Sequence, residues 1–166
     1  MNSIHVRTTA AFRGRLAVLA AVLALLALAT PRSSEAQGQI SGSGISRVGK
    51  DTRKLTASAQ AQAGSSAATG VLQFIHNSPG GLSRFRGTVS CLTVNGGVVQ
   101  LSGLIDKGET ATGTLLDGKA FAFTIQTGTA QAFSLPSFGD PGSLGACSGG
   151  QSSTVPVTEA GFTTQQ

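Results

Sequence analysis

Only a few side chains in this sequence have the chemistry of a catalytic or metal-binding site. Beyond residue 36 there is one histidine, His76, which follows Leu72 and Phe74 in an alternating run. A zinc site needs three or four ligands, and no second nitrogen ligand accompanies His76. We therefore predict no catalytic residues, no metal site and no cofactor. His76 remains the one side chain suited to proton transfer near neutral pH.

Two short motifs resemble known site motifs but lack the parts on which their chemistry depends. The run Gly44–Asp51 nearly matches a phosphate-binding loop, yet Asp51 stands where a hydroxyl should bind magnesium. We interpret this run as a turn between two strands. Gly145–Gly149 carries Cys147 where a nucleophile elbow has serine, but a Pro/Gly loop precedes it instead of a strand.

Charged side chains near predicted turns are two further candidates for ligand binding. Asp106, Glu109 and Asp117 have the oxygen ligands that calcium prefers, but their spacing matches no calcium loop. Arg84 and Arg86 flank one residue and therefore project from the same side of a strand. That pair either holds an anionic ligand or keeps the strand soluble.

The two cysteines, Cys91 and Cys147, are predicted to form a disulfide. In an exported domain the environment is oxidising, so a single pair is expected to be bonded. The bond would connect a central strand to a glycine-rich tail. On that strand Cys91 is expected to share a face with Phe85, Gly87 and Val89, by alternation. The alternative is two separate thiols.

The first 36 residues have the organisation of a cleavable signal peptide, which would be helical. Three arginines precede an uninterrupted apolar run of fourteen residues from Leu16 to Ala29. That run is shorter than the ~20 residues of a membrane-spanning helix. Small residues in Ser34–Ala36 predict cleavage before Gln37, and secretion or delivery to the periplasm or cell envelope. The alternative is an uncut N-terminal anchor.

The rest of the chain, residues 37–166, is predicted to form a single exported domain. It holds eight basic and six acidic side chains, so the pI near 10.0 overstates how basic this part is. Nucleic-acid binding requires clustered Lys and Arg, and the one basic run, Arg47–Lys54, contains an acid. We predict no nucleic-acid partner and no stable membrane insertion after cleavage. A small apolar ligand or an envelope component remains as the partner class.

Alternation of apolar and polar residues predicts strands throughout this domain. From Leu55 to Ala63 every second residue is apolar, which is the period of a half-buried strand. Asn95-Gly96 predicts a tight hairpin, because both turn residues need positive φ. Other strands are predicted at 40–46, 71–76, 85–94, 98–105, 119–127, 130–135, 154–157 and 161–164, with turns at Asp106-Lys107-Gly108 and Asp117-Gly118-Lys119.

About eight short strands with regular turns and no helical period are typical of an all-β antiparallel barrel or sandwich. The main strands are expected within 39–135, and 136–166 form a Gly/Ser-rich tail that returns to the sheet. We favour the barrel because no strand is rich in the charges that protect open edges. The alanines of 55–63 are expected to pack under Phe121, Phe123 and Ile125.

The hairpin Val89–Gly96, followed by Val99–Gly103, resembles a group of small exported bacterial proteins. Members share an early Gly-x-Gly strand, here Gly42-Ser43-Gly44, a Cys-Leu-x-Val hairpin and a later cysteine. Their late segment usually has an Asp-rich turn, where this chain has Gln126–Thr129. The group is functionally uncharacterised, so the resemblance implies an exported β domain and no activity.

Three functions remain open at this level. The first is a non-catalytic secreted or envelope-associated domain with a structural or binding role. The second is a β-barrel carrier of an apolar ligand, since eight strands can enclose one small ligand. The third is a metal-independent barrel enzyme of cyclase or isomerase type. The side chains predicted to line such an interior are His76, Val99, Leu101, Phe121, Phe123 and Ile125.

Overall fold

The computed structural model describes residues 36–62, 64–144, 147 and 149–165. The predicted leader lies outside the described residues except for Ala36, which begins the first strand. Ten strands are described, and no helix is found among these residues, hence none that could span a membrane. In chain order the strands are β1 (Ala36–Val48), β2 (Asp51–Gln62), β3 (Ala67–Ser78), β4 (Gly81–Asn95), β5 (Val98–Glu109), β6 (Ala120–Gln126), β7 (Ala132–Ser134), β8 (Ser137–Gly139), β9 (Thr154–Pro156) and β10 (Glu159–Gln165).

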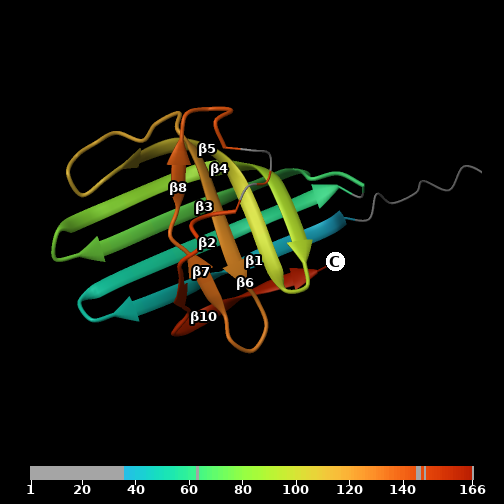
Figure 1. Cartoon of the computed structure of the whole chain (residues 1–166), viewed down its shortest axis with the longest axis horizontal. Coiled ribbons are helices and arrows are strands. Elements are labelled where there is room, and N and C mark those ends of the chain that lie inside the picture. Colours follow the sequence, from blue (N-terminus) through green and yellow to red (C-terminus); the bar gives the residue numbers. More distant parts are fainter. Residues whose placement is uncertain (1–35, 63, 145–146, 148, 166) are drawn as a thin grey trace, which may run out of the picture. The chain divides into compact units, whose positions relative to one another are not determined.

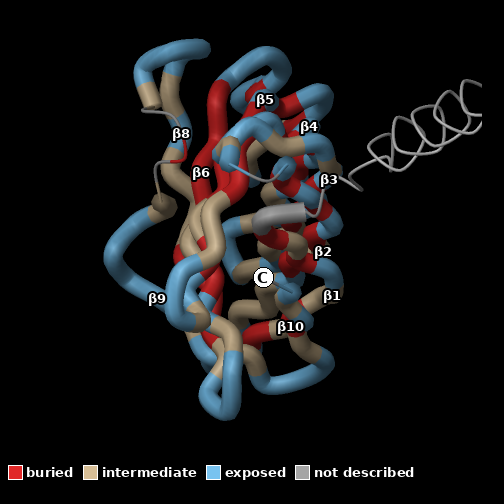
Figure 2. Tube along the Cα trace, turned by 90° about the vertical axis from the view of Figure 1, so that its right-hand side faces the viewer, coloured by how far each residue is buried: buried red, intermediate tan, exposed pale blue. Residues whose placement is uncertain are grey.

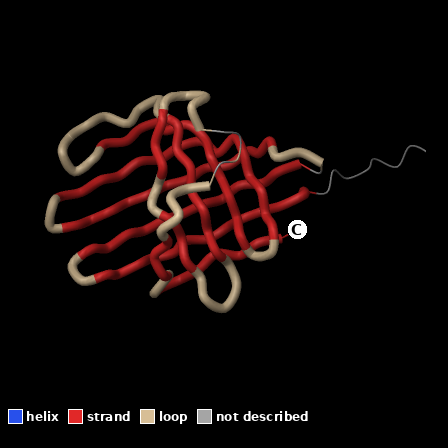
Figure 3. Tube along the Cα trace, viewed as in Figure 1, coloured by secondary structure: helices blue, strands red, loops and turns tan. Residues whose placement is uncertain are grey.

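The strands form one antiparallel sheet that curls onto itself as a half-barrel. Their order is β10-β1-β2-β3-β4-β5-β6-β7-β9, and β8 pairs with β6. The long strands form one layer, and β6, β7 and β8 cross it at a steep angle (Figure 1). Strands dominate the domain, and turns and loops connect them (Figure 3). Buried residues gather between the two layers (Figure 2).

The predicted all-β antiparallel fold is therefore confirmed, and two details of it are corrected. The strands β1 to β5 are 12 to 15 residues long, so the prediction of short strands is wrong for them. The turn between β4 and β5 consists of Gly96 and Gly97, with φ of 57° and 83°, because Asn95 pairs with Val98. The hairpin is present, but its turn is one residue later than Asn95-Gly96 predicts.

Two aromatic rings pack directly on glycines, Phe121 of β6 on Gly87 of β4 and Phe162 of β10 on Gly44 of the neighbouring strand β1. A Cβ at Gly87 would lie 2.6 Å from Cε1 of Phe121, and a Cβ at Gly44 would lie 2.6 Å from Cε2 of Phe162. Phe121, Phe123 and Ile125 share one core with Ala57, Ala59 and Ala61, as predicted. Small residues on one layer thus accept large ones from the other, which is how protein interiors reach their density.

Two β-bulges interrupt the pairing of β4 with β5. Val89 pairs with Gly103 and Cys91 with Ser102, so Ser90 is an extra residue in β4. An extra residue shifts the alternation of faces by one. Leu92 consequently joins the core cluster, from which Cys91 is absent, and the expectation that Cys91 shares the face of Val89 is wrong. The second bulge, at Asp106 in β5, shapes the site described below.

The predicted disulfide between Cys91 and Cys147 is present, with a Cα–Cα distance of 5.0 Å. It connects β4 to the segment between β8 and β9, across a sequence separation of 56. The bond therefore holds the glycine-rich tail to a central strand. It is consistent with an oxidising environment such as the periplasm or the cell exterior.

A glutamine side chain connects the two ends of the curled sheet. The Nε2 of Gln131 donates to the carbonyl of Phe162 at 2.9 Å, and its Oε1 accepts from the Phe162 N–H at 2.7 Å. The backbone carbonyl of Gln131 accepts from the N–H of Val157 at 2.8 Å. The Gln131 amide thus pairs with β10 as a peptide group of a neighbouring strand would.

An exposed ion pair holds the start of β10 to β1. Arg47 donates to Glu159 at 2.7 Å. The hydrogen bond and the charge of Arg47 lower the pKa of the Glu159 carboxyl below its ordinary value. The N–H of Thr158 also donates to the carbonyl of Ile45 at 2.7 Å, so the pair supports backbone contacts at the same place.

Removing the disulfide should destabilise the domain. We expect the double change Cys91→Ser and Cys147→Ser to lower the free energy of unfolding by about 2–5 kcal/mol, because the unfolded chain regains the freedom of a long loop. Denaturant unfolding followed by circular dichroism measures this, and chemical reduction of the unaltered protein should shift the midpoint similarly. An unchanged midpoint in both experiments would contradict the stabilising role.

Removing the Gln131 amide should also destabilise the domain. Gln131→Ala leaves the N–H and carbonyl of Phe162 without their partners, which costs about 1–3 kcal/mol for buried groups. Gln126→Ala is the matched control, because Gln126 is exposed and its side chain makes no hydrogen bond to a described residue. Equal unfolding free energies for the two variants would show that the Gln131 contact is dispensable.

Candidate functional site

The predicted interior-lining residues lie in a packed core. Val99, Leu101, Phe121, Phe123 and Ile125 are each 0% exposed. The Phe123 ring lies 5.4 Å from that of Phe74 and 6.3 Å from that of Phe121, between ring centroids. Of these five residues only Phe121 borders any of four hollows found in the described structure. A ligand-carrying interior stays a prediction for these residues.

His76 lies at one end of the inner face, in a row with Ser46 and Arg53 on neighbouring strands. Its Nε2 is 3.5 Å from Oδ2 of Asp51, an electrostatic contact that is not a hydrogen bond, and Arg53 donates to the same oxygen at 2.7 Å. Ser46 Oγ, Arg53 Nε and His76 Nε2 are buried without a hydrogen-bond partner among the described residues. His76 thus has a neighbouring carboxylate, but it borders none of the four hollows.

The other predicted motifs take structural positions. Gly44–Asp51 forms the end of β1, a turn and the start of β2. Cys147 is part of the disulfide, and residues 145, 146 and 148 of the elbow-like motif lie outside the described residues. In the described part of the chain no three His, Cys, Asp or Glu side chains are grouped to hold a metal ion.

A hollow with a volume of about 610 Å³ lies on the outer face of the sheet, over β3, β4 and β5, and we call it the basic hollow. Successive residues of a strand face opposite sides of the sheet. Phe85 and Gly108 therefore face inward, while the side chains of their neighbours in β4 and β5 face the hollow. The lining residues are Gln73, Arg84, Phe85, Arg86, Lys107, Gly108, Glu109, Leu115 and Asp117.

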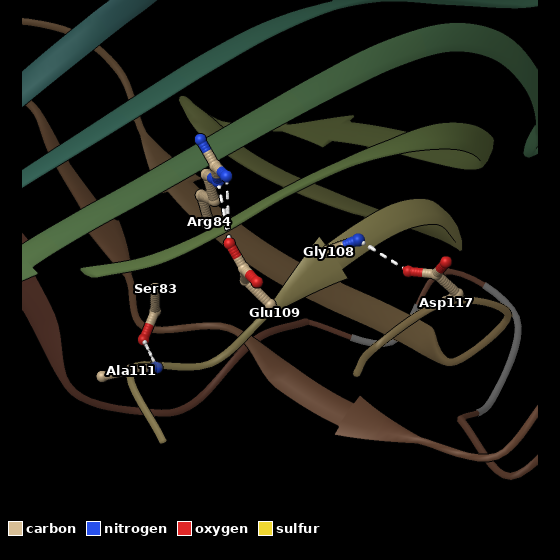
Figure 4. Close-up of polar contacts among 6 residues, drawn as sticks. All are labelled: Ser83, Arg84, Gly108, Glu109, Ala111 and Asp117. Carbon is tan, nitrogen blue, oxygen red and sulfur yellow. Dashed lines mark hydrogen bonds and ion pairs between the residues drawn. The ribbon is translucent and has the colours of Figure 1, made fainter. Parts of the chain in front are cut away.

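The loop after β5 forms one wall of the basic hollow and is fixed at several points (Figure 4). The N–H of Gly108 donates to Asp117 at 2.8 Å, and the N–H of Ala111 donates to Ser83 at 2.9 Å. The N–H of Leu116 donates to the carbonyl of Gly108 at 2.9 Å. These bonds hold Leu115, which is 70% exposed, at the edge of the hollow.

Both carboxylates of the basic hollow already have donors. Arg84 donates to one oxygen of Glu109 through Nε at 3.2 Å and Nη2 at 3.0 Å (Figure 4). Asp117 accepts from the Gly108 backbone. The nearby Asp106 lies outside the lining and accepts from the hydroxyl of Thr88 at 3.1 Å. Asp106, Glu109 and Asp117 thus have separate partners and do not converge as a calcium site would require.

Arg86 and Lys107 are the two cations of the hollow without such a partner. They pair directly across β4 and β5, and both are exposed. Neither makes an ion pair or hydrogen bond with a described residue. Like charges directly opposite each other destabilise an antiparallel pair of strands. The opposition of Arg86 and Lys107 therefore lowers the stability of the pairing between β4 and β5. An anion between the two side chains would remove that repulsion.

The sequence pattern predicts half of this cationic pair. Arg84 and Arg86 share the outer face as predicted, but Glu109 binds Arg84 and leaves Arg86 without an acidic partner. The pattern does not predict Lys107, because Asp106-Lys107-Gly108 is typical of a turn. Instead β5 continues, and the bulge at Asp106 turns Lys107 outward, since Ile105 pairs with Gly87 and Lys107 with Arg86. Two consecutive charged residues directly after the buried Ile105 are the signal that could have revealed the bulge.

Reversing the charge of Lys107 should stabilise the domain. Lys107→Glu replaces a repulsion across the strands with an ion pair to Arg86, which is worth about 0.2–1 kcal/mol. Lys50→Glu, at the exposed turn between β1 and β2, is the control and should change the unfolding free energy less. Denaturant unfolding at low salt measures both, and a destabilised Lys107→Glu protein would contradict the repulsion.

Comparisons of the chain with protein-family models, with curated proteins and with solved structures found no match. The function of the basic hollow therefore has to follow from its own side chains.

Proposed function

We propose that this protein is an exported, non-catalytic binding domain whose basic hollow holds an anionic group of an envelope component. The main observation in support is that Arg86 and Lys107 lie opposite each other on β4 and β5, and neither has an acidic partner among the described residues. Sites that break a local stability rule are often functional. Here the broken rule is charge repulsion, and an anionic ligand is what relieves it.

The chemistry of the two side chains suits a carboxylate or phosphate. A guanidinium presents a planar fork of N–H donors, and an ammonium adds a compact charge beside it. Charge-assisted hydrogen bonds of this kind are stronger than neutral ones. Leu115 adds an exposed apolar contact at the edge, which favours an organic ligand over a bare inorganic ion.

Export and the absence of catalysis are parts of the same proposal. The leader-like residues 1–36 and the disulfide between Cys91 and Cys147 both support an oxidising location outside the cytoplasm. Within the hollow no residue pairs a nucleophile with a base: His76 lies on the inner face, and Cys147 is bonded. Binding is the role that this set of side chains supports.

The test is binding of a simple anion to the purified, oxidised protein. Galacturonate, a sugar with one carboxylate, is titrated at low salt while NMR follows the backbone amides of β4 and β5. We expect saturable shifts around the basic hollow, and at least about tenfold weaker binding for Arg86→Gln with Lys107→Gln, a loss of at least about 1.4 kcal/mol.

Lys50→Gln is the control for the loss of one charge and is compared with the single changes Arg86→Gln and Lys107→Gln, because Lys50 is exposed and lies outside the basic hollow. It should bind galacturonate as the unaltered protein does. Binding should weaken as salt rises, because exposed charges are screened. Shifts that survive the double change, or that occur away from β4 and β5, would reject the proposal.

A further inference from the structure

A row of five polar side chains leads from the basic hollow across the outer face, and we call it the outer row. Each member pairs with the next in the register of the sheet, and all five face away from the core. Neighbouring strands lie ~4.8 Å apart, so the outer row extends for roughly 19 Å. From β1 to β5 its members are Ser43, Thr56, Gln73, Arg86 and Lys107.

None of the five side chains is used to stabilise the described fold. No hydrogen bond or ion pair connects any of them to a described residue, whereas both flanking rows hold such contacts. On one side Arg84 binds Glu109, and on the other Thr88 binds Asp106. The outer row therefore presents two hydroxyls, one amide and two cations that remain free to bond with a partner.

We infer that the outer row binds an acidic oligosaccharide that lies across the strands, with a carboxylate in the basic hollow. This inference rests on the proposed function. The strand spacing is comparable with the length of one pyranose unit, so successive sugars meet successive strands. The hydroxyls of Ser43 and Thr56 and the amide of Gln73 can donate to and accept from sugar hydroxyls, and Arg86 and Lys107 bind the acid.

A glycan fits this surface better than a nucleic acid does. Single-stranded nucleic acids are bound through aromatic side chains on which bases stack, and the outer row contains none. Phe138, the exposed phenylalanine among the described residues, is on β8. A lipid surface would need a contiguous apolar patch, but Val71 and Leu104, in the adjacent row, are separated by Thr88.

The experiment compares galacturonate with tetragalacturonate on the purified, oxidised protein, by calorimetry and NMR at low salt. We expect the tetramer to bind at least about tenfold more tightly than the monomer. The double change Ser43→Ala with Thr56→Ala should remove this advantage and leave binding of the monomer unchanged, because neither residue lines the basic hollow. The matched control is Ser41→Ala with Ser58→Ala, an exposed pair of hydroxyl residues on the same two strands, which should keep the advantage.

The outcomes separate this inference from the proposed function. Equal affinities for monomer and tetramer, with monomer binding still dependent on Arg86 and Lys107, would overturn the glycan and leave the anion site. No binding of either would overturn both. Tighter binding of a single-stranded oligonucleotide, or of vesicles rich in anionic lipid, that does not depend on Ser43 and Thr56 would also overturn the glycan. Maltotetraose, which is neutral, should bind at least about tenfold more weakly than tetragalacturonate.

Discussion

The seating of phenylalanine rings on glycines of the inner face is the contact on which the rest of the structure depends. Phe121 lies against Gly87, so β6 can approach the layer of long strands closely, and Phe162 of β10 lies against Gly44 of the neighbouring strand β1. Any side chain at these glycines would occupy the space of a ring. The curled sheet can therefore bury most of one face against itself, without a helix to cover it among the described residues.

Because most of the core lies on the inner face, the outer face of the long strands is free of packing demands except at Cys91, which is buried and bonded to Cys147. Its residues need only be compatible with water and with the twist of the sheet. A broad surface of this kind, held rigid by five long strands, can position side chains at the spacing of the backbone itself. The basic hollow and the outer row use this regularity, and the fixed loop 110–119 adds a wall at one end.

Local sequence patterns predicted the parts of the fold that depend on neighbours in the chain. The alternation at Leu55–Ala63 predicted both the strand and its buried face. The disulfide was predicted because a single pair of cysteines in an oxidising environment is expected to be bonded. Features that depend on pairing between strands were not predictable in this way. The register that places Lys107 opposite Arg86, and the contact of Gln131 with Phe162, join residues that no periodicity connects. The two bulges also escaped detection, since a bulge interrupts the pattern from which strands are recognised.

Because of the bulges at Ser90 and Asp106, the face on which a side chain of β4 or β5 lies depends on the number of residues before it as well as on residue type. Each inserted residue changes the parity of every later position in its strand, so the same amino acid would face the opposite side without it. Cys91 leaves the core face and Lys107 reaches solvent through this odd count alone. In relatives of such a domain, gain or loss of one residue at either place would exchange interior and surface along the strand. The number of residues in each strand of this hairpin thus decides which side chains are buried and which are exposed, without any change in residue type.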